Sequence, residues 1–127
     1  MREIKFRAWD TMTKHMIYNV FPRNSHGAVV SFDYDINPHG TLIFVELMQF
    51  TGLFDKNRKE IYEGDIVRLP NEDICEIQYK ADWDYSGFLA ISVTKLYGTE
   101  SYKYWSGKVI GNVYENPELL KEKWEQY

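Results

Sequence analysis

The chain of 127 residues is long enough for one domain with a buried core, and its hydrophobic content of 44% excludes an intrinsically disordered protein. Aromatic residues make up 17% of the chain, and because flat rings pack well across pleated surfaces, this composition favours a mainly β fold. The net charge of −4 excludes a global positive field that would attract nucleic acid.

The N-terminal residues predict a β-hairpin. In residues 4–9 apolar side chains alternate with Lys5, Arg7 and Trp9, and this period of two is typical of a strand. A turn at residues 10–14 then leads into a returning strand. We expect Lys5, Arg7 and Trp9 on the outer face, where cations can meet phosphates and an indole can stack on a base. The alternative interpretation is an edge strand whose charges prevent aggregation.

Charge is unevenly distributed along the N-terminal part of the chain. Residues 1–23 hold five basic and two acidic side chains, whereas residues 24–52 hold three acidic side chains and no Lys or Arg. Segments of opposite sign either face each other across a subunit contact or share a solvated surface. The first ten residues lack the apolar core of a signal peptide, and no run of 18 apolar residues occurs, so we expect a cytoplasmic protein without a membrane contact.

A short strand at residues 28–32 precedes a polar segment that contains the grouping best suited to hold a metal ion. Its members are Asp33, Asp35 and His39, with His26 as a further ligand. Two carboxylates and an imidazole suit Zn²⁺, Mn²⁺ or Fe²⁺. Their spacing matches no metal-binding signature, however, and Asp, Asn, Pro and Gly are also the ordinary residues of loops. We therefore interpret the segment as a loop and predict no metal.

The stretch at residues 47–68 organises the rest of the chain. The apolar run at residues 42–50 fits a helix or a strand, and its β-branched residues favour a strand. No apolar residue occurs between Asp55 and Glu60. A polar turn at residues 55–58 therefore joins two extended segments that fold back on each other.

A second turn at residues 63–65 leads into the buried strand Ile66-Val67. Gly64 can adopt a positive φ there, and the Asp65 carboxylate can accept a hydrogen bond from a backbone N–H two residues on. The alternative interpretation makes Glu63 and Asp65 a carboxylate pair for acid–base or metal chemistry, which requires partners from elsewhere in the chain.

Residues 74–80 predict a strand that places Cys75, Ile77 and Tyr79 on one face. Cys75 is the only cysteine, which excludes an intramolecular disulfide and a cysteine-based zinc site and favours a reducing compartment. No helix N-terminus or basic partner marks Cys75 as an activated thiolate, so we expect a small core residue. A core strand follows at residues 88–93.

Two aromatic segments are the predicted protein-contact surface. They supply Trp83, Tyr85, Tyr102, Tyr104 and Trp105. Aromatic side chains framed by acidic residues suit a protein contact better than a phosphate backbone. The alternative is that these rings are core or strand-pairing residues, as aromatic residues in small β-barrels often are.

The C-terminal part predicts a closing strand at residues 108–114, followed by a helix. Gly111 inside the strand indicates a bulge or a close approach of another backbone segment. Asn116-Pro117-Glu118 reads as a helix N-cap, first position and acidic first turn. The helix carries one apolar stripe, formed by Leu120, Trp124 and Tyr127.

The chain contains no glycine-rich phosphate loop, no nucleophile elbow and no paired Cys/His metal signature. Several short motifs instead follow one another in a specific order: REIKFRAWD at 2–10, MQFTGL at 48–53, DKN at 55–57, KEIYEGDIV at 59–67 and VIGNVYENPELL at 109–120. In this order and spacing the chain resembles the YopX family of small phage and prophage proteins over essentially its whole length.

The resemblance implies a mainly β (α+β) fold, an SH3-like β-barrel around the EGDIV strand, with an N-terminal β-hairpin and a short C-terminal helix. It also implies a single domain over 1–127, with an N-terminal β-rich lobe at 1–54, the barrel at 55–114 and the helix at 115–127. The family pattern usually has glycine where this chain has Arg58, so we expect a different or longer turn there. The resemblance implies an intracellular setting in a bacterial host and supplies no catalytic residue.

We therefore predict a non-enzymatic phage or prophage accessory protein that binds a phage or host protein and self-associates, without catalytic residues or a cofactor. The alternative is a nucleic-acid-binding accessory factor that uses the basic N-terminal strand. A third hypothesis is a metal-dependent hydrolase, whose site would combine Asp33, Asp35, His39, Glu63 or Asp65.

Overall fold

The structure of the chain is a computed structural model that describes residues 3–22, 29–31, 41–42, 45–81, 86–93, 101–102 and 105–120. These residues form two compact units, Met1–Gly52 and Leu53–Tyr127. Within the described ranges the fold is mainly β, with two antiparallel sheets and a single helical turn at residues 118–120. No helix in these ranges is both long enough and apolar enough to cross a membrane.

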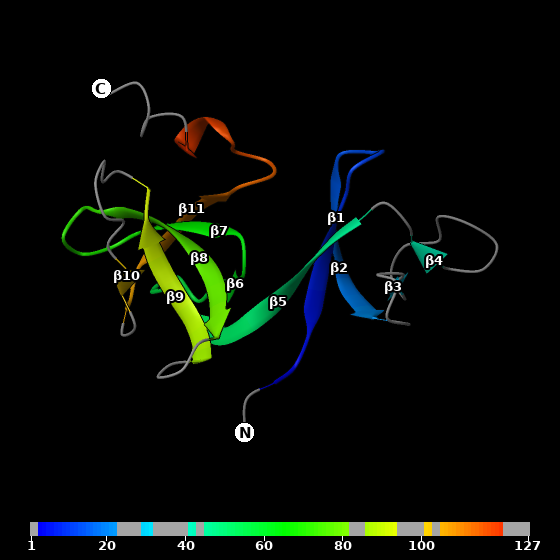
Figure 1. The fold of residues 1–127 in the computed structure, drawn as a ribbon, viewed down its shortest axis with the longest axis horizontal. Helices are drawn as coiled ribbons and strands as arrows, with labels where there is room; N and C mark the ends of the chain where they lie inside the picture. Colours follow the sequence, from blue (N-terminus) through cyan, green and yellow to red (C-terminus); the bar gives the residue numbers. More distant parts are fainter. Residues whose placement is uncertain are drawn as a thin grey trace. The chain divides into compact units, whose positions relative to one another are not determined.

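The first unit is built on the predicted N-terminal hairpin. Strand β1 (Phe6–Asp10) pairs with β2 (His15–Pro22), and the turn between them closes with a hydrogen bond from Lys14 N to Asp10 O of 2.8 Å. On its other side β1 pairs with β5 (Val45–Phe54), so it lies between two strands (Figure 1). The hypothesis of an exposed edge strand is therefore wrong.

Two short strands extend the same sheet beyond β2. Strand β3 (Val29–Ser31) pairs with β2, and β4 (Thr41–Leu42) pairs with β3. The order along the sheet is β4-β3-β2-β1-β5-β6, so β6 (Glu60–Tyr62) is the last strand and is hydrogen-bonded to β5. The preference of residues 42–50 for a strand is thus confirmed where the structure describes them. A small core of Ala8, Ile17 and Val20 fills this unit.

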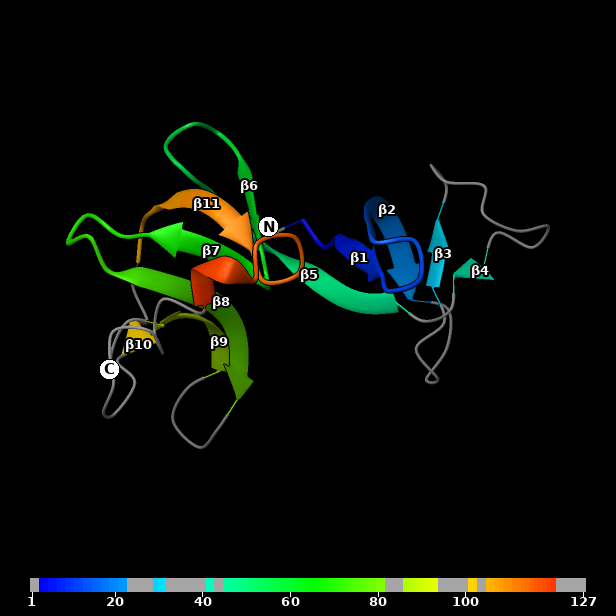
Figure 2. The same ribbon diagram turned by 90° about the horizontal axis from the view of Figure 1, so that it is seen from above.

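The second unit contains the other sheet, with the order β10-β9-β8-β7-β11 (Figure 2). Its strands are β7 (Asp65–Arg68), β8 (Ile74–Ala81), β9 (Ser86–Ser92), β10 (Ser101–Tyr102) and β11 (Lys108–Asn112). The first four follow one another as a meander, and β11 returns to pair with β7. No closed barrel is formed within the described ranges.

The buried strand predicted at Ile66-Val67 is the centre of this unit, since both side chains are fully buried. Cys75 is also fully buried and packs in the same core, as predicted. Tyr79 differs: alternation places it on the face of Cys75, but it is 47% exposed near the strand end and packs edge-on against Phe88, with ring centroids 5.3 Å apart.

Strand β11 contains the predicted irregularity at Gly111, where the register with β7 shifts. A Cβ atom at Gly111 would lie 2.6 Å from Asn116 Oδ1, so the close neighbour is a side chain and not the backbone segment that we expected. The Asn116 side chain does not cap the following turn. Its Oδ1 instead accepts a hydrogen bond from Asn112 N at 3.1 Å, which holds the start of the helical turn against the strand. The apolar stripe at Trp124 and Tyr127 lies outside the described residues.

Candidate functional site

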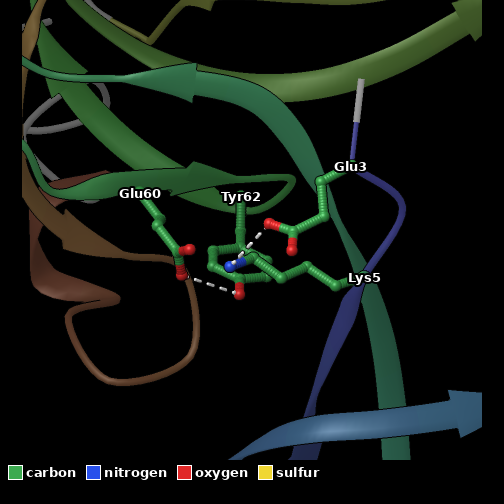
Figure 3. Close-up of polar contacts among 4 residues, drawn as sticks. All are labelled: Glu3, Lys5, Glu60 and Tyr62. Carbon is green, nitrogen blue, oxygen red and sulfur yellow. Dashed lines mark hydrogen bonds and ion pairs between the residues drawn. The ribbon is translucent and has the colours of Figure 1, made fainter. Parts of the chain in front are cut away.

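The face of the N-terminal strand that we predicted to be exposed is largely buried. Arg7 is 2% and Trp9 is 8% exposed, and Ala8 on the opposite face is fully buried, so both faces of β1 are covered. Lys5 is half-buried and forms an ion pair of 3.2 Å with Glu3 (Figure 3). Its Nζ also lies 4.8 Å from the centroid of the Phe50 ring. The prediction that these three residues together present a nucleic-acid contact is therefore wrong for Arg7 and Trp9.

Asp65, considered from the sequence as a partner of Glu63, has a structural role in the turn. Its carboxylate is buried, and Oδ2 accepts a hydrogen bond of 2.8 Å from Tyr62 N, three residues upstream. Gly64 adopts the expected positive φ, 88°. Asp65 thus ties together the two ends of the turn between β6 and β7. The neighbouring Tyr62 hydroxyl donates to Glu60 Oε1 at 3.1 Å (Figure 3).

No group of three His, Cys, Asp or Glu side chains converges as a metal site among the residues that the structure describes. The metal grouping considered from the sequence, Asp33, Asp35, His39 and His26, lies outside these residues. Cys75 is sealed in the core, as a structural rather than a nucleophilic residue would be.

A second buried carboxylate, Asp55, organises the turn between β5 and β6. Its Oδ1 accepts hydrogen bonds from Asn57 N (2.8 Å) and Lys59 N (2.9 Å), and its Oδ2 accepts one from Val109 N (3.1 Å). Burial raises the pKa of Asp55, but these backbone hydrogen bonds outweigh it, and the net pKa lies below the usual value. Asp55 therefore fixes this turn against the start of β11.

The predicted aromatic contact residues are only partly accessible. Tyr102 and Trp105 are half-buried and pack against the core of the second unit. The Tyr102 hydroxyl donates to Asp73 Oδ2 at 2.8 Å, and Trp105 Nε1 donates to the Phe88 carbonyl at 3.2 Å. Their rings are thus held in fixed positions. Trp83, Tyr85 and Tyr104 lie outside the described residues.

A cleft in the second unit brings together side chains that the sequence analysis did not connect. Three segments line it: the turn after β5, the turn after β7 and the residues that lead into β11. Its volume is about 570 Å³, and it is lined by Phe54, Lys56, Asn57, Arg68, Leu69, Pro70, Glu72, Ser106, Gly107 and Lys108. This volume is typical of ligand-binding pockets. We call it the basic cleft.

The basic cleft has more positive than negative side chains. Lys56, Arg68 and Lys108 are all exposed, and the single acidic side chain in the lining, Glu72, lies 4.0 Å from Arg68 Nε. An adjoining pocket of about 290 Å³ shares Leu69, Pro70 and Ser106 with the cleft. Tyr102 and Trp105 line this second pocket and give it an aromatic wall.

The basic cleft could not be found from local sequence patterns, because its three cations come from segments that are far apart in the chain: the turn after β5, the end of β7 and the start of β11. The strand pairing of β7 with β11 and the hydrogen bond from Val109 N to Asp55 bring these segments together. The arrangement offers positive charge beside apolar and aromatic surface. Chemically it is suited to binding an anionic ligand.

The family model described as YopX protein matches residues 5–121 of the chain. Among solved structures, the chain is similar to the crystal structure of protein EF1440 from Enterococcus faecalis. The two share 27% sequence identity with a TM-score of 0.53, and the match covers 94% of this chain and 99% of the other. No curated protein matches the chain significantly. Because the family model spans nearly the whole sequence, the chain belongs to the YopX family.

Proposed function

We propose that the chain is a non-enzymatic phage or prophage accessory protein of the bacterial cytoplasm, which binds another protein through the basic cleft and self-associates. The observation that carries this proposal is the cleft itself, in which Phe54, Leu69 and Pro70 provide apolar surface beside exposed cations. Phe54 is 58% exposed, and a large exposed apolar side chain at a cleft wall is typical of a protein contact.

The strand order of the second unit supports the proposal that this unit is an SH3-like barrel. A meander whose final strand returns beside its first strand, as β11 does beside β7, is the pairing that lets a small sheet curl toward closure. In such a barrel the turns between strands form the binding surface. The basic cleft is built from such turns.

The test is an affinity pull-down from phage-infected host lysate with nuclease present. It compares the tagged wild-type chain with a cleft variant, R68Q/K108Q, and with a control, K80Q, which removes an exposed charge outside the cleft lining. We expect one protein to be retained by the wild type and by K80Q and lost by the cleft variant. Equal capture by all three proteins would contradict the role of the cleft.

Self-association is tested by light scattering of the purified chain. A strict monomer would contradict this part of the proposal.

Nucleic-acid binding is the second candidate, now at the basic cleft rather than on the N-terminal strand. The supporting observation is that Tyr102 and Trp105 line a pocket next to three cations, an arrangement that also suits a base and its phosphates. Binding of this kind weakens steeply with salt. Retention of oligonucleotides that falls strongly between 50 and 200 mM salt, with partners lost after nuclease, would favour this candidate.

A further inference from the structure

Two of the cleft cations lie directly opposite each other on neighbouring strands. Lys108 of β11 is the register partner of Arg68 of β7, so their side chains project from the same face of the sheet. Like charges in this position are destabilising. Glu72 offsets little of this, since it lies 4.0 Å from Arg68 Nε and both side chains are largely exposed. The fold thus keeps a charge arrangement that opposes its own stability.

A third cation extends the positive charge across the cleft. Lys56, on the turn after β5, lines the same cleft as Arg68 and Lys108. Phe54, Leu69 and Pro70 add apolar side chains to the lining that holds these cations. A ligand that fits all of these features carries at least two negative groups with an apolar side chain between or beside them.

We infer that the basic cleft binds a short acidic peptide segment of a protein partner, an inference that rests on the proposed protein-binding function. Carboxylates of the segment pair with Arg68, Lys108 and Lys56, and an apolar side chain packs against Phe54 and Pro70. Carboxylate geometry matches the guanidinium group, which donates two parallel hydrogen bonds to the two carboxylate oxygens. An anion between Arg68 and Lys108 also relieves the repulsion of the like-charged pair.

The net charge of the second unit favours a short acidic segment over a long polyanion. Residues 53–127 contain fourteen acidic and ten basic residues, although three of those basic residues line the cleft. A nucleic acid that carries many phosphates would be repelled by this net negative charge more strongly than a short peptide. A peptide whose negative charge ends within the cleft avoids that repulsion.

The first experiment selects binders of the full-length chain from a random 12-residue peptide display library. We expect enrichment of sequences in which Asp or Glu flanks one large apolar residue, with binding that weakens as salt rises. Enriched peptides without acidic residues that still require the cleft would overturn the acidic inference and leave the proposed function intact. If no peptide is enriched, the inference of a short acidic segment fails, and the pull-down described above decides the proposed function by itself. If oligothymidylate of 20 nucleotides binds the cleft instead, both the inference and the protein-binding proposal fail.

The second experiment measures binding and stability together in R68Q, K108Q and the double variant, with K80Q as the matched control. The probe is the most enriched peptide, followed by fluorescence anisotropy. We expect the double variant to bind about tenfold more weakly, as the loss of two exposed charge pairs implies. We also expect its urea midpoint to rise, because the repulsion across β7 and β11 is removed.

Weaker binding with an unchanged or lower urea midpoint would overturn the inference that the like-charged pair is kept to bind an anion. Unchanged peptide binding by the double variant would show that the basic cleft is not the binding site.

Discussion

Arg58 shows how a single residue can conflict with its turn. Its φ is 64°, in the left-handed region that glycine occupies without a Cβ penalty. From the sequence we expected the absence of glycine to change the turn type or length. The structure keeps the left-handed position and places arginine in it, because the Asp55 hydrogen bonds to Asn57 N and Lys59 N fix the turn from both sides.

Replacing Arg58 with glycine should therefore stabilise the chain. The left-handed conformation costs a non-glycine residue roughly 1–2 kcal/mol, and the extra freedom of glycine in the unfolded chain removes about 0.4–1 kcal/mol of that gain. We expect R58G to raise the free energy of unfolding by about 0.5–1 kcal/mol in urea titrations. K59G in the same turn is the control and should lower it. A loss of stability in R58G would show that the arginine side chain contributes more than its backbone strain costs.

At the scale of elements, β11 depends on a contact with the turn that follows it. Because a Cβ at Gly111 would lie 2.6 Å from Oδ1 and 2.8 Å from Cγ of Asn116, G111A must displace that side chain and its hydrogen bond to Asn112 N. We expect a loss of about 1–3 kcal/mol in the free energy of unfolding.

The matching test is a double-mutant cycle with N116A, measured by urea denaturation. In N116A the oxygen that meets the new methyl group is gone, so G111A should cost much less in that background than in the wild type. Equal costs of G111A in both backgrounds would indicate that the backbone of β11, rather than the Asn116 side chain, rejects the methyl group.

The strands were predictable from the sequence, but which of their faces are buried was only partly so. Alternation in residues 4–9 predicts β1 correctly but leaves one face of the strand to solvent, whereas the burial of Arg7, Ala8 and Trp9 shows that both faces are covered. The irregularity at Gly111 could be predicted, because a glycine inside a strand pattern is a local signal. The basic cleft could not be predicted, because no sequence rule links Lys56, Arg68 and Lys108 before the pairing of β7 with β11 is known.

At the scale of the whole molecule, buried carboxylates set the response to acid. Burial raises the pKa of Asp10, as it does for Asp55, but hydrogen bonds from Thr13 N and Met12 N outweigh it and the net pKa is lowered. A carboxyl whose folded pKa lies below its unfolded value adds stability that is fully present above the unfolded pKa of about 4. That stability is lost as the pH falls through the folded pKa.

The substitution D55N tests this dependence. An amide retains one acceptor oxygen and turns a donor toward Val109 N, so we expect a loss of about 1–3 kcal/mol in the free energy of unfolding at pH 7. The difference from the wild type should shrink in urea titrations as the pH falls below about 4, because the unfolded chain then binds a proton at Asp55 while the native carboxylate, with its lowered pKa, stays ionised. E46Q, which changes an exposed carboxylate, should show neither effect. A difference that stays constant with pH would mean that the charge of Asp55 does not contribute.

Glu76 changes the stability of the fold with pH in the opposite direction from Asp10 and Asp55. Burial raises its pKa, and this effect exceeds the lowering by the hydrogen bond from Gln78 and by the charge of Lys80. Its ionised form therefore opposes folding at neutral pH, and that opposition disappears as the pH falls through its raised pKa. The change in stability with acid is the sum of the contributions of these groups. Asp10 contributes in the first unit and Asp55 in the second.

The complete burial of Cys75 gives the chain a natural reporter of its own opening. Since it is the single thiol in the sequence, a thiol reagent added to the native protein has one target, and that target becomes accessible only when the strands around it separate. The rate of modification, followed by mass spectrometry as the denaturant concentration is varied, reads out the free energy of opening of the second unit without any introduced label. The same signal would register a ligand in the basic cleft as slower modification, because a ligand that binds the folded state lowers the population of the open one.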